Sequence, residues 1–151
     1  MMKMKKRSKR LKPVVLHAKN QEQEAARIFA DAQQRVTDSE QQLQQLETYR
    51  DEYLNRYQQL SQTSGSMNQL LDYQAFLAKL NQGIGQANNT INICRQQRDI
   101  LKQQWLQRRT RTQALDSVVQ KYQQAEMKHQ TYLEQKEIEE FSQQQHQIHR
   151  R

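Results

Sequence analysis

The chain has 151 residues, of which 34% are hydrophobic, and its formal net charge is +8. This apolar content is too low for the thick core of a globular domain of that length. The chain also has only one proline and three glycines, fewer than is usual in disordered chains. Long helices that each bury one narrow apolar stripe are therefore favoured.

The first residues form a basic segment. Residues 1–13 hold seven basic side chains and no acidic one, and we expect 1–12 to be a basic N-terminal tail. Such a tail either lies on anionic lipid or stays solvated. The apolar run behind it, PVVL, is too short for a signal peptide. No apolar run approaches the roughly 20 residues that cross a bilayer, so we expect a cytoplasmic protein with no transmembrane segment.

A first heptad pattern predicts a helix over 13–62. Counting a positions every seven residues from Val15 and d positions from Ala18, 11 of 14 positions are apolar or aromatic. This excess over the rest of the chain is typical of a coiled-coil seam.

The heptad phase is lost over residues 61–69, and we expect a turn at 63–67. Ser66 and Gln69 fit the capping box S-x-x-Q, in which the serine side chain caps the amide three residues later and the glutamine reaches back. Gly65 suits the left-handed residue that ends a helix. The segment therefore predicts a reversal between two helices.

A second heptad pattern predicts a helix over 68–145. Counting from Leu70 and Tyr73, 13 of 16 seam positions are apolar. Gly83 and Gly85 each cost a helix about 1 kcal/mol relative to alanine, but the phase continues across them, which indicates one helix with a soft spot. Beyond residue 125 the register slips, and a weaker, differently phased helical stretch is expected before a frayed C-terminus at 146–151.

The fold class that follows is all-α, a long antiparallel two-helix coiled-coil hairpin with an overhanging C-terminal helix. Folding about residue 65 places position 15 opposite about position 115. Parallel homodimerisation through the seams is the structural alternative. The expected coiled-coil core comprises Val15, Phe29, Val36, Leu43, Leu46, Tyr57, Leu60, Leu77, Leu80, Ile84, Ile91, Cys94, Leu101, Trp105, Leu115 and Val119.

No motif of an enzyme is present, so we expect no catalytic residue, no cofactor and no metal. His146 and His149 fit a solvated polar tail better than a metal site. The lone Cys94 excludes an internal disulfide, and its seam position indicates packing rather than reactivity. Five aromatic residues cluster near the turn: Tyr49, Tyr53, Tyr57, Tyr73 and Phe76. They either fill the seam or, since Tyr49 and Phe76 stand beside it, form a partner-binding patch.

A run of basic residues in the second helix is a possible phosphate-binding patch. No nucleic-acid-binding module matches the chain, and a solvated face or an acidic protein partner fits better, so no nucleic acid is expected. A nucleic-acid-binding helical hairpin remains an alternative, as does a generic coiled-coil secretion chaperone or scaffold. The patch comprises Arg95, Arg98, Lys102, Arg108, Arg109 and Arg111.

Three segments resemble the FliJ family of flagellar protein-export components: EAARIF at 24–29, QQLQQLETYRDEY at 41–53 and LDYQAFLAKLNQGIGQ at 71–86. The resemblance covers roughly residues 11–125 and implies a non-enzymatic coiled-coil hairpin that is similar to the central stalk of rotary ATPases. It also implies three partners: the hexameric flagellar export ATPase, the cytoplasmic domain of the membrane export gate, and export chaperones. The implied location is peripheral, at the cytoplasmic face of the inner membrane.

The resemblance also implies a gate-binding patch near the turn. Carried over position by position, the patch comprises Gln42, Leu46, Tyr49, Tyr53, Phe76, Leu80, Gly83 and Ala87.

Overall fold

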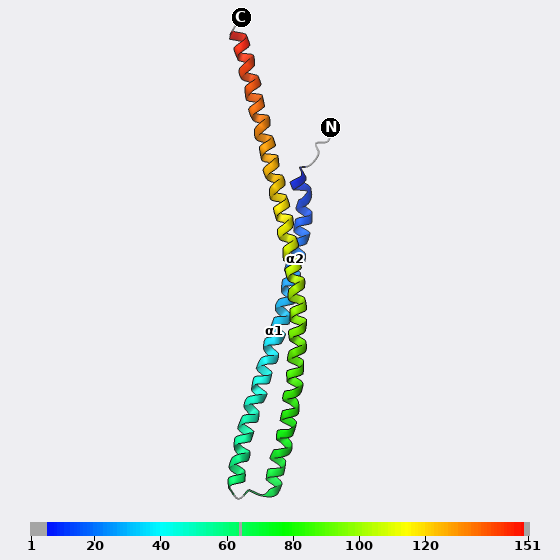
Figure 1. Ribbon diagram of the computed structural model, residues 1–151, viewed down its shortest axis with the longest axis vertical. Coiled ribbons are helices and arrows are strands. Elements are labelled where there is room, and N and C mark those ends of the chain that lie inside the picture. The colour runs from blue at the N-terminus through cyan, green and yellow to red at the C-terminus, as the bar shows by residue number, and fades with distance from the viewer. Residues whose placement is uncertain (1–5, 64, 150–151) are drawn as a thin grey trace. The chain divides into compact units, whose positions relative to one another are not determined.

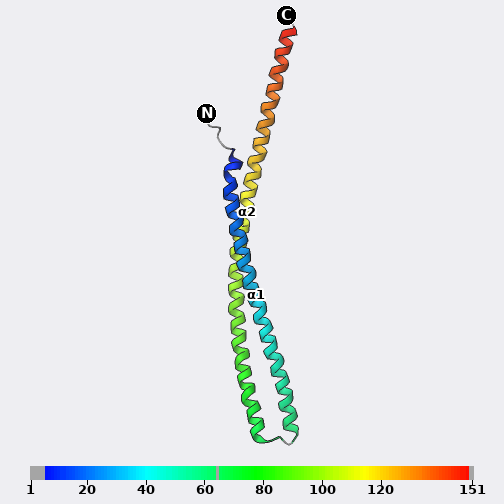
Figure 2. The ribbon, with the colours of Figure 1, turned by 180° about the vertical axis from the view of Figure 1, so that it is seen from behind.

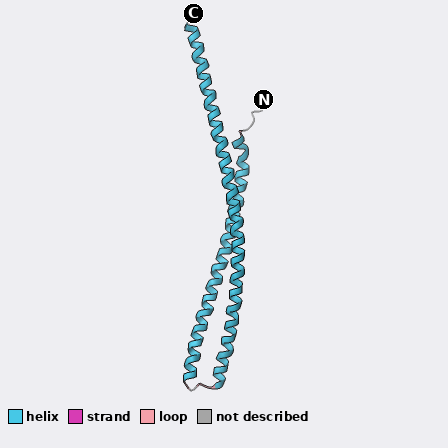
Figure 3. Ribbon diagram, in the orientation of Figure 1, coloured by secondary structure: helices cyan, strands magenta, loops and turns pink. Residues whose placement is uncertain are grey.

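The computed structural model describes residues 6–63 and 65–149, and in these ranges every regular element is an α-helix. Helix α1 spans Arg7–Gln62 and helix α2 spans Met67–His149 (Figure 1; Figure 3). The expected all-α helical hairpin is confirmed. Parts of the expected tail (1–5), turn (64) and C-terminus (150–151) lie outside the described residues.

The chain divides into two compact units. The turn unit comprises Glu24–Trp105, and the terminal unit comprises Met1–Gln23 with Leu106–Arg151. Within the turn unit, the segments of α1 and α2 lie side by side and run in opposite directions, as the front and back views both show (Figure 1; Figure 2).

The heptad positions face the partner helix. All 14 seam positions of α1 are buried or half-buried, and so are all those of α2 except the exposed Arg108. Phe29 and Trp105 stack across the seam with ring centroids 5.6 Å apart and an interplanar angle of 5°. Because two helices alone bury little, only seven apolar side chains of the described residues are buried: Ala18, Ala32, Val36, Leu77, Leu80, Ile84 and Ile91.

Helix α1 begins at Arg7, so residues 7–12 of the expected tail are helical, although Pro13 lies inside the helix. Proline is unusual inside a helix because it lacks an amide donor. The amide of Ser8 and its hydroxyl each donate a hydrogen bond to the carboxylate of Glu126 on α2, at 3.2 Å and 2.7 Å. Glu126 thus satisfies a free amide of the first turn and holds the segment against α2.

The reversal between the helices uses the serine cap that the sequence predicts. The Ser66 hydroxyl accepts a hydrogen bond from the amide of Gln69 at 3.2 Å, and α2 begins at the next residue, Met67. No described glycine has a positive φ, so the left-handed conformation expected for Gly65 is wrong. A Cβ at this position would lie 2.8 Å from Leu60 Cγ. Glycine therefore fits here because the Leu60 side chain approaches the backbone too closely for a larger residue.

The last part of α2 is exposed to solvent. The helix continues to His149, so 146–149 are helical rather than frayed. Every residue from Met127 to His149 is exposed, including Ile138 and Phe141 at 66% and 62%. This stretch, coloured from yellow-orange to red in Figure 1, is therefore a helix held by its own backbone bonds.

Helix α2 passes through Gly83 and Gly85 without interruption, and a Cβ at either position would meet no atom within 4 Å. We expect Gly83→Ala and Gly85→Ala each to raise the free energy of unfolding by about 1 kcal/mol, because alanine removes backbone freedom from the unfolded chain. Urea unfolding followed by circular dichroism measures this change. Gly65→Ala is the matched control and should destabilise by about 1 kcal/mol through displacement of Leu60; equal effects at all three positions would contradict this account.

Candidate protein-binding surfaces

Four aromatic rings gather near the turn, and they form what we call the aromatic cluster: Tyr49 and Tyr53 of α1 with Tyr73 and Phe76 of α2. Tyr53 is at the centre, with its ring centroid 4.4 Å from that of Phe76, 5.2 Å from that of Tyr49 and 5.5 Å from that of Tyr73. Edge and tilted contacts of this kind stabilise beyond the area they bury. The cluster is therefore a fixed arrangement.

Tyr49 is the member of the cluster that solvent reaches most. Its exposed fraction is 46%, and its ring meets Phe76 edge-on at 6.1 Å. It borders two shallow hollows on α1, one lined by Gln42, Gln45 and Leu46, and the other by polar residues from Gln41 to Glu52. A half-exposed ring with a rigid base and a hollow beside it is the form that binding anchors take.

The eight residues of the expected gate-binding patch differ in exposure. Gln42 and Tyr49 are exposed, whereas Leu46, Tyr53, Phe76, Gly83 and Ala87 are half-buried and Leu80 is buried at 9%. Leu80 thus packs beneath the expected gate-binding patch and is not accessible on its surface. Tyr73 contacts Tyr53 and so belongs to the aromatic cluster, although the expected gate-binding patch does not include it.

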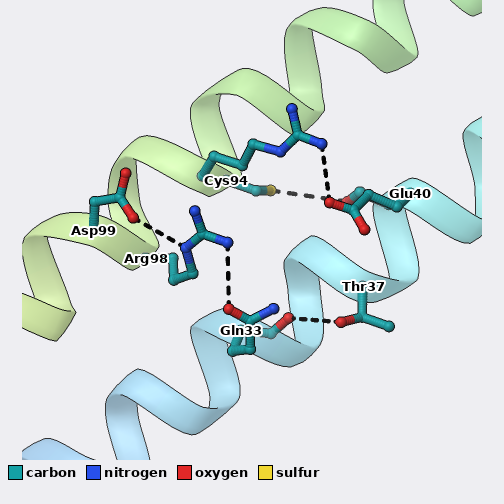
Figure 4. Close-up of polar contacts among 8 residues, drawn as sticks. Gln33, Thr37, Glu40, Cys94, Arg98 and Asp99 are labelled. Atoms are coloured by element: carbon teal, nitrogen blue, oxygen red, sulfur yellow. Dashed lines mark hydrogen bonds and ion pairs between the residues drawn. The ribbon is translucent and has the colours of Figure 1, made fainter.

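The possible basic patch is largely engaged within the chain. The guanidinium of Arg95 pairs with Glu40 at 3.0 Å, and that of Arg98 donates to the Gln33 side chain at 3.3 Å and pairs with Asp99 at 3.1 Å (Figure 4). Arg108 donates to Gln21 at 3.0 Å, and Arg109 also has a partner. Lys102 and Arg111 are exposed. Side chains that bind α1 are poorly available to phosphates, which weakens the nucleic-acid alternative.

The seam position of Cys94 matches its surroundings. Its sulfur lies 3.9 Å from the Ser39 hydroxyl across the seam, and the side chain is half-buried (Figure 4). Within the described residues, no group of three or more His, Cys, Asp or Glu side chains is placed to hold a metal ion.

The start of α1 and the α2 segment beside it form the second surface, in the terminal unit. The hollow there is lined by lysines, among them Lys6 just before α1 and Lys9 and Lys12 within it, and by α2 residues that include Glu126 and Met127. The hydrogen bonds from Ser8, together with the positive charges of Lys6 and Lys9, hold the pKa of Glu126 below its ordinary value of 4.5 despite its partial desolvation. No signal in the sequence indicates this contact, because its partners are 118 residues apart.

Comparison with known proteins agrees with this architecture. A family model described as "Flagellar FliJ protein" matches residues 7–151. The chain belongs to the FliJ family. The flagellar FliJ protein of Escherichia coli (strain K12) is 27% identical over 126 residues, which cover 83% of this chain and 86% of that protein. No solved structure matches the chain.

Membership of the FliJ family supports a role as a component of flagellar protein export. In the described part of the chain, neither helix has a stretch that is both long and apolar enough to cross a membrane.

The contact between Ser8 and Glu126 predicts a pH dependence. A carboxyl group whose pKa is lowered by folding stabilises the fold while it is ionised, and this contribution is lost as the pH falls below 4.5 through the folded-state value. We therefore expect the backbone amides of residues 8–12 to be protected at neutral pH and to exchange faster, relative to their intrinsic rates, below that pH. Hydrogen exchange read by mass spectrometry measures this.

Glu126→Gln should lower protection of the same amides at neutral pH to about the level that the unaltered chain shows at low pH, and so remove the transition. Glu139→Gln, which changes an exposed residue of the same helix, is the control and should leave both unchanged. Protection that is independent of pH in the unaltered chain would show that Glu126 does not hold the helix start.

Proposed function

We propose that this protein acts without enzymatic activity of its own, as a stalk-like helical adaptor in flagellar protein export. In this proposal the turn unit binds the cytoplasmic domain of the membrane export gate, and the terminal unit binds the ring of the hexameric export ATPase. The observation that carries the proposal is the aromatic cluster with Tyr49 half-exposed on it, in a chain that belongs to the FliJ family.

The gate-binding role rests on the anchoring of Tyr49. Interfaces draw most of their binding energy from a few aromatic or arginine side chains seated on a rigid base. Tyr53 and Phe76 supply that base, and the hollow at Gln42 and Leu46 gives a partner side chain a place beside the ring. Leu80 supports the patch from within the seam, and the bare backbone at Gly83 allows close approach.

The ATPase-binding role rests on the exposed end of α2. From Thr131 to His149 every residue is exposed, and the helix offers its whole circumference to a partner. Apolar side chains at Met127, Ile138 and Ile148 are each at least 66% exposed, and they are separated by polar residues that keep the helix in solution. A helix without a neighbour fits a role inside a ring of subunits, where contacts come from several sides.

Export chaperones complete the set of proposed partners. The proposed location is cytoplasmic and peripheral at the inner membrane, since the gate is a membrane component. The alternative function, a generic coiled-coil scaffold, would not bind these partners specifically. Measuring ATP hydrolysis by the export ATPase with and without the purified protein distinguishes the two functions. We expect faster turnover and co-elution with the ring; the absence of both would exclude the stalk role.

Tyr49→Ala combined with Phe76→Ala tests the gate-binding surface. We expect the affinity for the gate domain to fall by about 30-fold, which corresponds to the loss of about 2 kcal/mol at an interface anchor. Helix content by circular dichroism should barely change, because neither ring is fully buried. Isothermal titration against the purified cytoplasmic domain measures the affinity.

Leu54→Ala combined with Leu71→Ala is the matched control. Both leucines are exposed apolar residues of the turn unit, at 40% and 53%, and helical spacing places them on faces away from Tyr49 and Phe76. Their removal should leave gate binding unchanged. Full binding by the double aromatic variant, or an equal loss in the leucine variant, would refute the assignment of the surface.

A further inference from the structure

The start of α1 carries a positive face that the proposed export contacts do not explain. Lys6, Lys9 and Lys12 follow one another at intervals of three residues, and all three are exposed. The sequence contains no acidic residue before Glu22. This face is therefore densely cationic along the whole first part of the helix.

Exposed apolar side chains share this face. Leu16 is 61% exposed and stands seven residues after Lys9 and four after Lys12, so the three side chains lie on the same side of the helix. Pro13, four residues after Lys9, is exposed as well. Ser8 and Ala18 are buried against α2, and Lys6, Lys9 and Lys12 border the hollow beside them.

The acidic residues nearby do not neutralise the lysines. Glu126 lies close enough to Lys6 and Lys9 for their charges to lower its pKa, but its two oxygens accept the hydrogen bonds from Ser8. Asp116 pairs with Lys19 at 3.9 Å. The Glu126 carboxylate therefore lies near Lys6 and Lys9, and with Lys12 an excess of positive charge remains.

The position of these charges is unfavourable for the helix itself. The N-terminus of a helix carries partial positive charge, which cations oppose, and the first turn of α1 contains no acidic residue. Pro13 also removes a backbone hydrogen bond from this stretch. An external anionic surface would offset the first of these penalties.

We propose that the start of α1 binds the surface of a bilayer that contains anionic phospholipids. The ammonium groups of Lys6, Lys9 and Lys12 contact the headgroup phosphates, and Leu16 enters the boundary between headgroups and acyl chains. The exposed aliphatic side chain among the cations favours a lipid surface over an acidic peptide, because a fluid interface accepts Leu16 without a shaped pocket.

The test is flotation of the purified full-length protein with vesicles rich in phosphatidylglycerol, compared with vesicles of phosphatidylcholine alone. We expect binding to the anionic vesicles only, weakening as salt is added. Lys6→Gln, Lys9→Gln and Lys12→Gln together should weaken binding by about 100-fold, since each cation near the surface contributes about fivefold. Leu16→Gln should weaken it by about fivefold through lost apolar contact.

A control variant separates this local face from net charge. Lys79→Gln, Lys102→Gln and Arg111→Gln remove the same number of charges from exposed positions elsewhere on α2, and binding should be nearly unchanged. Glutamine keeps the helix propensity of lysine, and circular dichroism checks that each variant folds. The proposal is overturned by equal losses in the two triple variants, by no affinity for anionic vesicles, or by binding to soluble poly-glutamate without binding to vesicles.

Discussion

The structure depends on the burial of one apolar stripe of each helix against the other. With only two helices in contact, each seam residue keeps an edge near solvent, and few side chains of the described residues are fully buried. Stability therefore accumulates over many small contributions along the seam rather than from one core. The same geometry places any binding surface on side chains beside the seam, as at Tyr49.

Polar contacts across the seam select the alignment of the helices. An apolar heptad pattern can shift by seven residues at modest cost, so a coiled coil needs polar side chains that match in only one register. Arg98 with Gln33, Arg95 with Glu40, and Ser8 with Glu126 meet this need. Exposed pairs of this kind contribute at most about 1 kcal/mol each, so their importance is specificity more than stability.

The sequence was sufficient for the hairpin because periodicity is a local signal. Heptads from Val15 and from Leu70, a phase break and the cap at Ser66 need no knowledge of distant contacts. Val15 and Val119 border the same hollow, whereas the sequence led us to expect position 15 opposite about position 115. The difference of four residues arises because the alignment of the helices depends on contacts across the seam. The start of α1 was misplaced since the bond between Ser8 and Glu126, which holds it, joins distant residues.

The candidate surfaces were predictable only in part, for the same reason. The sequence was enough to indicate the aromatic residues near the turn, whereas the central place of Tyr53, which contacts three other rings, follows from how the helices align. The engagement of Arg95, Arg98 and Arg108 with α1 likewise has no local signature.

The exposed end of α2 has a consequence for how the chain can change over time. From Met127 to His149 no side chain is buried, so a substitution there alters only helix propensity, by a few tenths of a kcal/mol for most residues. A substitution at Val36, which is wholly buried, disturbs packing on both helices. Selection for folding thus constrains the residues of the seam much more than those at the end of α2. The sequence of that end can therefore change in response to a binding partner without loss of the fold.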